Sequence, residues 1–232
     1  MELGGKASSI VCEDADLTDA ARQCAMGAFF HAGQVCMATE RILVHKSILD
    51  AFRDALKAAL DELLTVTNGH TKTQRVSQLI SCASVAKNKR LVRDALAKGA
   101  QIVYGNLETN ELSSTTMCPI VLENVSRTME IHYAESFGPT LSLFSFDNDE
   151  AAIEMANDTE YGLTGAVFTK DLRRALKIAR AIETGAVHIN SMTIHDEPSL
   201  PHGGAKNSGF GRFNGLQGLD EWVRTKVVTW KD

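Results

Sequence analysis

The 232-residue sequence predicts an α/β fold in which a sheet is layered with helices. Stretches with apolar residues at helical spacing alternate along the chain with short, extended apolar stretches, and this alternation is typical of that fold class. The composition is 44% hydrophobic and 23% charged, which provides enough apolar material for a large core. Because no linker, internal repeat or low-complexity segment interrupts the chain, we expect one continuous unit.

The elements of the first half follow one another in a clear order. A helix is predicted over residues 17–29, with Asp16 as its cap and Gly33 as its stop. Its apolar residues share one face at helical spacing: Leu17, Ala20, Ala21, Cys24, Ala25, Ala28 and Phe29. A strand is predicted at residues 41–45, and Ser47 then opens a second amphipathic helix. The apolar face of that helix carries Leu49, Phe52, Leu56, Leu60 and Leu63.

The second half continues the alternation. A third helical region is predicted from about residue 76 to residue 98, where Gly99 ends it before a strand at residues 102–104. A further helix follows Asp171 and stops at Gly185. The remaining extended segments are residues 120–122, 141–146, 166–169 and 186–189.

Charge and cysteine content exclude several classes of protein. The formal net charge of −5 leaves no basic footprint for nucleic acid or for an anionic membrane surface. No run approaches the roughly 18 apolar residues of a membrane span, and the N-terminus lacks the order of a signal peptide, so we expect a cytoplasmic protein. Five cysteines without a C-x-x-C pair indicate neither a disulfide framework nor a zinc ribbon.

Cys36 is the first candidate for chemistry. It lies between the predicted end of a helix and the start of a strand, where rigid elements often hold reactive groups, and a thiolate there can act as a nucleophile. Cys24 instead falls on the apolar stripe of its helix and is expected to be inert. Position alone leaves two interpretations of Cys36 open, a catalytic nucleophile and an ordinary buried thiol.

Glu2 and Glu135 are the carboxylates beside unusual backbone. Glu2 precedes Leu3-Gly4-Gly5-Lys6, and Glu135 precedes the turn-forming run Ser136-Phe137-Gly138-Pro139. A solvated surface glutamate remains the alternative interpretation for both positions.

A glycine-rich run suggests a phosphate-binding loop and a histidine-containing cluster suggests a metal site, but neither pattern fits that function. The glycine-rich run at residues 203–212 fails the dinucleotide-binding fingerprint, because Asn214 stands where the third glycine belongs, so it predicts only a tight loop. His195-Asp196-Glu197 and His202 have the residue types of metal ligands. Consecutive residues of an extended chain point in opposite directions, however, and we therefore expect no metal site.

Four sequence blocks together resemble the aldehyde dehydrogenase superfamily. They follow the family's order over almost the whole chain: Glu2-Leu3-Gly4-Gly5-Lys6, Gly33-Gln34-Val35-Cys36 with Thr39-Glu40-Arg41, Glu135-Ser136-Phe137-Gly138-Pro139, and Asn190 with Gly203-Gly204-x-Lys206-x-Ser208-Gly209. The run Pro201-His202-Gly203-Gly204 is most similar to the salicylaldehyde and vanillin dehydrogenase branch. The resemblance implies a three-layer α/β/α sandwich, the family's catalytic domain, over residues 1–214. Residues 215–232 would then form a C-terminal helix and the start of an oligomerisation strand.

The same resemblance implies the oxidation of an aldehyde, of aromatic type in this branch, to a carboxylic acid with NAD or NADP. Cys36 would form a thiohemiacetal and then a thioester, and Glu2 would activate the water that hydrolyses the thioester. The implied cofactor contacts are Glu135, Phe137, Leu3 and Gly4. The implied aldehyde pocket comprises Val35, Met37, Ile194 and His202, and the imidazole of His202 would hydrogen-bond a phenolic substrate. A homodimer or tetramer is implied for the full-length form.

Family members are much longer than this chain, which therefore resembles a truncated form. The part without a counterpart would carry the dinucleotide-binding domain and a second oxyanion donor, and the loss of one such donor costs about 3 kcal/mol of transition-state stabilisation. Three hypotheses stay open at this point. The chain is the catalytic half of a dehydrogenase, an inactive fragment or pseudoenzyme that serves as an oligomerisation module, or a cofactor-independent esterase.

Overall fold

A seven-stranded sheet forms the centre of the computed structural model, which describes residues 1–68, 71–74, 77–107 and 113–232. Its strands lie in the spatial order β12 (Ala186–Ile189), β11 (Thr164–Phe168), β1 (Ala7–Val11), β2 (Thr39–His45), β9 (Thr140–Phe146), β8 (Ile120–Glu123) and β6 (Gln101–Tyr104). Neighbouring strands run parallel except for β8 and β6, which pair antiparallel at one edge. Because parallel neighbours need crossover connections, helices cover both faces of the sheet.

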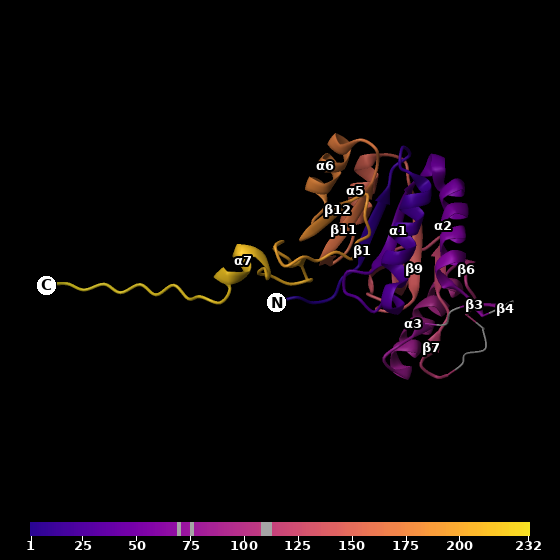
Figure 1. Ribbon diagram of the computed structural model, residues 1–232, viewed down its shortest axis with the longest axis horizontal. Helices are drawn as coiled ribbons and strands as arrows, with labels where there is room; N and C mark the ends of the chain where they lie inside the picture. Colours follow the sequence, from indigo (N-terminus) through magenta and orange to yellow (C-terminus); the bar gives the residue numbers. More distant parts are fainter. Residues whose placement is uncertain (69–70, 75–76, 108–112) are drawn as a thin grey trace.

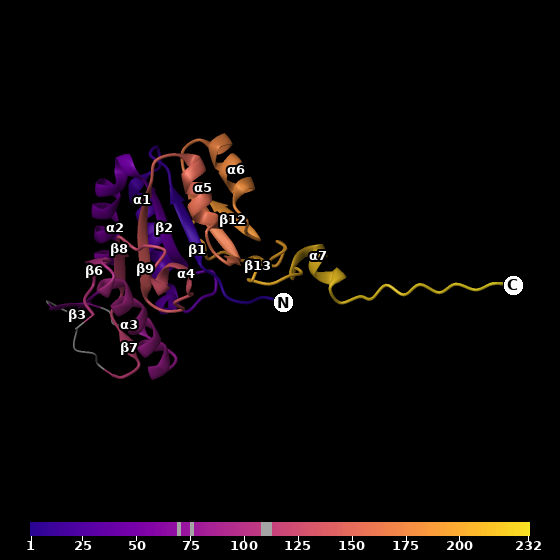
Figure 2. The same ribbon diagram turned by 180° about the vertical axis from the view of Figure 1, so that it is seen from behind.

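Helices form the two outer layers (Figures 1 and 2). One face carries α1 (Leu17–Phe29) and α2 (Leu49–Leu64), and the other carries α3 (Cys82–Ala97), α5 (Asp149–Asn157) and α6 (Leu172–Ala181). The predicted three-layer α/β/α arrangement is therefore confirmed. The connections contain the short helices α4 (Glu130–Tyr133), α7 (Gly215–Asp220), η1 (Phe30–Gly33) and η2 (Lys46–Ile48). They also contain the short strands β3 (Thr65–Asn68), β4 (Thr71–Gln74), β5 (Ser77–Gln78), β7 (Thr116–Met117), β10 (Tyr161–Gly162) and β13 (Ala205–Lys206).

The central strands are buried on both faces, as parallel strands between two helical layers must be. In β2, Ile42 belongs to the core beneath α1 and α2, while the neighbouring Leu43 belongs to the core beneath α5 and α6. Phe52 of α2 is fully buried in the first of these cores. Apolar residues thus fill both interlayer spaces, and the helices cannot leave the sheet without exposing them.

The predicted cap of α1 is confirmed, but its predicted stop at Gly33 is wrong. The Asp16 carboxylate accepts hydrogen bonds from the backbone N–H groups of Thr18 and Asp19. The helix ends at Phe29, and the η1 turn that follows holds His31 and Ala32 in the left-handed region. Gly33 also has a positive φ, and a Cβ there would lie 2.2 Å from the carbonyl oxygen of Gly138. Gly33 therefore allows two loops to come into close contact, and it does not end the helix.

Two further helix boundaries need correction, and two elements were not predicted. The helix α3 begins at Cys82 with Ser81 as its cap, because residues 77–78 form the strand β5; residue 76 lies outside the described residues. The helix α6 ends at Ala181, before Gly185. The strand β1 and the helix α5 were not predicted at all. The β1 sequence Ala7-Ser8-Ser9-Ile10-Val11 holds small and polar residues, so its apolar pattern is weak although every residue is buried.

The C-terminal end extends away from the three layers. After α7, residues 223–232 run outward as an extended segment (Figure 1). Val227, Val228 and Trp230 are more than four-fifths exposed, and the segment joins no strand among the residues that the structure describes. The expectation of an oligomerisation strand here stays a prediction. Within the described part of the chain, no helix is long and apolar enough to cross a membrane.

The contribution of the core beneath α2 can be measured with one substitution. Phe52→Ala removes a fully buried ring and should lower the free energy of unfolding by about 3–5 kcal/mol, because the transfer and cavity terms add. Leu63→Ala on the same helix, at a side chain that is 37% exposed, should cost about 1 kcal/mol or less. Urea denaturation of the two variants checks this, and equal losses would contradict the assignment of the buried face.

Candidate active site

The candidate residues meet because three neighbouring strands start at the same edge of the sheet. The strands β1, β2 and β9 are adjacent and parallel, so their amino ends lie side by side. Glu2 precedes β1, Cys36 precedes β2, and Glu135 precedes β9. Segments that are far apart in the sequence thereby converge at one place.

The glycine-rich loop holds the segment that carries Glu2. Glu2 and Gly209 form an isolated antiparallel bridge, in which the Leu3 N–H donates to the Ser208 carbonyl and the Phe210 N–H donates to the Met1 carbonyl. A Cβ at Gly209 would lie 2.2 Å from the Met1 carbonyl oxygen, so only glycine permits this pairing. The run that failed the phosphate-binding fingerprint therefore fixes the N-terminal segment.

Cys36 and Glu2 are in direct contact. The Cys36 thiol donates a hydrogen bond to Glu2 Oε1 at 3.3 Å. Burial raises the pKa of the Cys36 thiol to about 11, and the Glu2 carboxylate acts in the same direction. The backbone N–H groups of Cys36 and Met37 oppose this shift, which places two donors near the sulfur. A nucleophile beside a base is the arrangement that thiol chemistry requires.

Glu135 faces the same glycine turn from the other side. Its Oε1 accepts the Gly5 N–H at 2.8 Å, and burial raises the pKa of the Glu135 carboxyl. A Cβ at Gly4 would lie 2.6 Å from Glu135 Oε2, and a Cβ at Gly5 would lie 2.2 Å from the Cys36 carbonyl oxygen. The two glycines thus let the backbone pass between the Cys36 loop and Glu135. Leu3 is exposed, and Phe137 is half-exposed with φ 48° at the tip of the next turn.

A buried ion pair fixes this turn. Lys6 Nζ lies 2.6 Å from Glu40 Oε2 and donates to the Ala134 carbonyl, while Glu40 accepts the N–H groups of Ser136 and Phe137. Lys6 and Glu40 were not singled out from the sequence as functional residues. The available signal was a lysine directly before a buried strand, together with Glu40 and Arg41 inside an otherwise apolar one.

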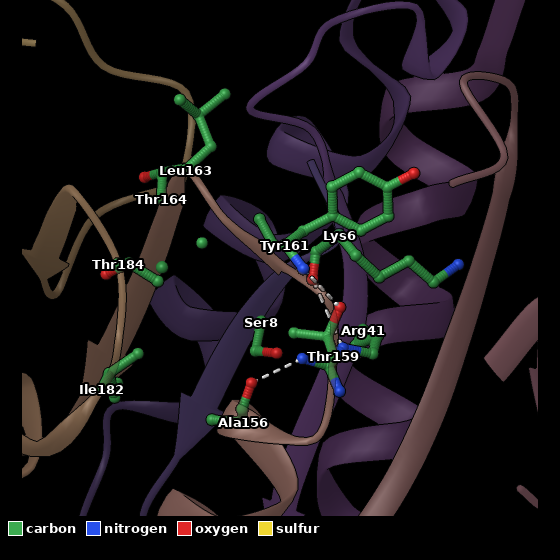
Figure 3. Close-up of a pocket in the computed structure, with 13 residues that line it drawn as sticks. Lys6, Ser8, Arg41, Ala156, Thr159, Tyr161, Leu163, Thr164, Ile182 and Thr184 are labelled. Atoms are coloured by element: carbon green, nitrogen blue, oxygen red, sulfur yellow. Dashed lines mark hydrogen bonds between the residues drawn. The ribbon is translucent and has the colours of Figure 1, made fainter. Parts of the chain in front are cut away.

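Arg41, next to Glu40 in β2, links the site to the helix α5. Its guanidinium donates to the carbonyls of Met155 and Ala156 at the C-terminal end of α5, and the bond to Ala156 is seen in Figure 3. Beside it lies a cavity of about 10 Å³, lined by Lys6, Ser8 and Tyr161 among others (Figure 3). That volume suits about one water molecule, so this cavity is not a substrate site.

The predicted pocket residues lie on two neighbouring segments. Thr193 Oγ1 donates to the Met37 carbonyl at 2.6 Å, which brings the segment with Ile194 next to the loop of Val35 and Met37. All three of these side chains are partly exposed. Thr193, fully buried, was missed from the sequence although it joins the two segments.

His202 lies near the carboxylate oxygen of Glu2 that Cys36 does not contact. Its Nε2 is 3.7 Å from Glu2 Oε2, and the imidazole is 5% exposed. Glu2 and His202 also line a separate cavity of about 230 Å³, together with Phe210, Phe213 and Trp222. His195 contacts Glu197, and its ring lies tilted against that of His188 with 5.1 Å between the ring centroids. The described residues contain no group of three or more side chains suited to hold a metal ion.

Comparison with known proteins identifies the family of this chain. The model of the aldehyde dehydrogenase family matches residues 1–228. The chain belongs to the aldehyde dehydrogenase family. It is 38% identical over 229 residues to the vanillin dehydrogenase of Pseudomonas fluorescens, a match that covers 99% of this chain and 46% of that protein. The chain therefore spans about half the length of the curated relatives it matches.

Solved structures of aldehyde dehydrogenases also match this chain, and they match it in fold. The salicylaldehyde dehydrogenase from Pseudomonas putida G7 complexed with salicylaldehyde superposes with a TM-score of 0.86 at 36% identity, over 95% of this chain and 45% of that one. The betaine aldehyde dehydrogenase from Staphylococcus aureus in complex with NAD⁺ also gives a TM-score of 0.86, at 35% identity, over 100% of this chain and 48% of that one. The α/β/α fold of this chain is thus that of aldehyde dehydrogenase structures.

The environment of Cys36 predicts an unusual pH dependence. Because the thiol pKa is raised to about 11, the thiolate is scarce at neutral pH and accumulates only as the pH rises. The rate of Cys36 alkylation by iodoacetamide, followed by mass spectrometry of its peptide, should still be climbing about tenfold per pH unit between about pH 7 and 9. The exposed Cys82 serves as the internal reference. A rate that levels off near pH 8.5, as for an ordinary thiol, would contradict this description of the site.

Proposed function

We propose that this chain carries the nucleophile and the general base of an aldehyde dehydrogenase that oxidises aromatic aldehydes. The observation that carries the proposal is the 3.3 Å contact between Cys36 Sγ and Glu2 Oε1. It joins the loops before two adjacent parallel strands, in a chain that belongs to the aldehyde dehydrogenase family. The proposal thus rests on a specific pair of groups and not on the fold alone.

In this proposal Glu2 takes the thiol proton and the sulfur of Cys36 attacks the aldehyde carbon. The new C–S bond converts the carbonyl oxygen into an alkoxide, and the N–H groups of Cys36 and Met37 beside the sulfur are proposed to stabilise it. After oxidation a thioester remains on Cys36. Once Glu2 has released the thiol proton to solvent, it takes a proton from water and the water oxygen bonds to the acyl carbon. The C–S bond then breaks to release the acid, and the leaving sulfur regains its proton from Glu2.

Residues of this chain fit the nicotinamide half of NAD or NADP. Glu135 Oε1 is engaged by the Gly5 N–H, and among the described residues no hydrogen bond to Oε2 occurs, which leaves that oxygen for a ribose hydroxyl. Gly4 provides the close approach that a side chain would block. Leu3 and the half-exposed ring of Phe137 flank this position. A bound nicotinamide would supply the hydride acceptor.

Aromatic aldehydes are the proposed substrate class. The relatives described above include a vanillin dehydrogenase and a structure complexed with salicylaldehyde. Val35, Met37 and Ile194 are proposed to contact the substrate, and His202 to line the pocket beside Glu2. The competing proposals are a cofactor-independent esterase and an inactive oligomerisation module, for which the exposed residues Val227 and Trp230 are the relevant surface.

NADH formation tests the proposal directly. With vanillin or salicylaldehyde and NAD, we expect absorbance at the NADH band from the wild type and none from Cys36→Ala, because the nucleophile is lost. Glu2→Gln should form NADH in one burst and then stall, with an acyl group on Cys36 detected by mass spectrometry, because hydrolysis lacks its base. Hydrolysis of a nitrophenyl ester without any NADH would favour the esterase. Neither signal, from folded protein, would favour the oligomerisation module.

A further inference from the structure

The second oxygen of Glu2 faces a buried histidine nitrogen that has no hydrogen-bond partner in the described part of the chain. Glu2 Oε1 accepts the Cys36 thiol, and Oε2 lies 3.7 Å from His202 Nε2. That nitrogen is buried and has no hydrogen-bond partner among the described residues. A buried polar atom without a partner costs about 1–3 kcal/mol, and a side-chain movement of a few tenths of an ångström toward Glu2 would satisfy it.

Of the two partners, His202 is the rigid one. Its backbone exchanges two hydrogen bonds with Phe213, at 2.8 and 2.9 Å, and its imidazole packs edge-to-face against the Phe213 ring at 5.1 Å. The Glu2 side chain is 27% exposed, and the glycine-rich loop holds the residues on either side of it through backbone hydrogen bonds. The imidazole can therefore hold the carboxylate, whereas nothing else in the described contacts holds Oε2.

The Glu2 side chain has room to rotate away from Cys36. The cavity of about 230 Å³ opens beside it, and the other charged side chains that line this cavity are those of Arg212 and Glu221. Rotation toward the guanidinium of Arg212 would take the carboxylate away from Cys36. A restraint on Oε2 is thus needed to keep Oε1 on the thiol.

We propose that His202 is a positioning residue for Glu2, donating a hydrogen bond from Nε2 to Glu2 Oε2 and so holding Oε1 against the Cys36 thiol. The role deepens the proposed function, since Glu2 is its general base, and it is separate from any contact that His202 makes with the substrate. Because His202 acts through Glu2, replacing it should matter only while the Glu2 carboxylate is present.

A double-mutant cycle read at Cys36 tests this. The readout is the pH profile of Cys36 alkylation in the whole chain, followed by peptide mass spectrometry, with Cys82 as internal reference. Glu2→Gln should speed alkylation at pH 8 about tenfold for each unit by which the thiol pKa falls, because the carboxylate disfavours the thiolate. His202→Phe should also raise the alkylation rate of Cys36, because a Glu2 side chain without this restraint forms the hydrogen bond with the thiol less often. His202→Gln keeps a donor and should stay close to the wild type.

The decisive comparison is His202→Phe in the two backgrounds. We expect an acceleration when Glu2 is present and none when position 2 is glutamine. No acceleration in the wild-type background would overturn the proposal, and so would an equal acceleration in both backgrounds, which would indicate a packing effect. His45→Phe, at the opposite end of β2, is the matched control and should leave the profile unchanged. The measurement needs neither aldehyde nor nicotinamide, so its outcome is separate from that of the NADH test.

Discussion

The buried ion pair between Lys6 and Glu40 is the interaction on which the site depends. Lys6 directly precedes β1, Glu40 lies in β2, and together they bind the carbonyl of Ala134 and the N–H groups of Ser136 and Phe137. Burial lowers the pKa of the Lys6 ammonium, and the carboxylate of Glu40 opposes that shift. Such a pair adds little net stability, but removing one member leaves a buried charge and costs about 3–5 kcal/mol. Its value here is geometric, because it joins the starts of three strands.

Once the strand starts are joined, glycines allow the loops to come within reaction distance. Gly4 and Gly5 pass between Glu135 and the backbone of Cys36, while Gly33 lies against the carbonyl of Gly138. Side chains at these positions would push the loops apart, and the contact between Cys36 and Glu2 would lengthen. The proposed nucleophile Cys36, the proposed base Glu2 and the carboxylate proposed for the ribose thus form one unit at the amino edge of the sheet. This differs from the common rule for open α/β sheets, whose ligands lie at the carboxyl ends of the strands.

Most of the helices and strands around this site could be predicted from the sequence, but only some of the contacts within the site could. Helices with strong caps and periodic apolar faces, such as the one after Asp16, were correct because their signals are local. The strand β1 was missed, since Ser8 and Ser9 are buried by neighbouring strands that local pattern cannot reveal. Cys36 and Glu2 emerged through resemblance, because their positions alone also suited a buried thiol and a surface carboxylate. The contact of Glu2 with His202 joins residues 200 positions apart and needed the structure.

Amide hydrogen exchange in Lys6→Met tests the central claim most directly. If the ion pair holds the turn before β9, the amides of Ser136 and Phe137, which donate to Glu40, should exchange faster than in the wild type. The amide of Ile42, inside β2, should change much less, because the sheet itself remains. Lys57→Met, at an exposed position of α2, is the matched control and should alter neither rate. An equal change at all three amides would contradict the account, because it would mean that Lys6 contributes only to global stability.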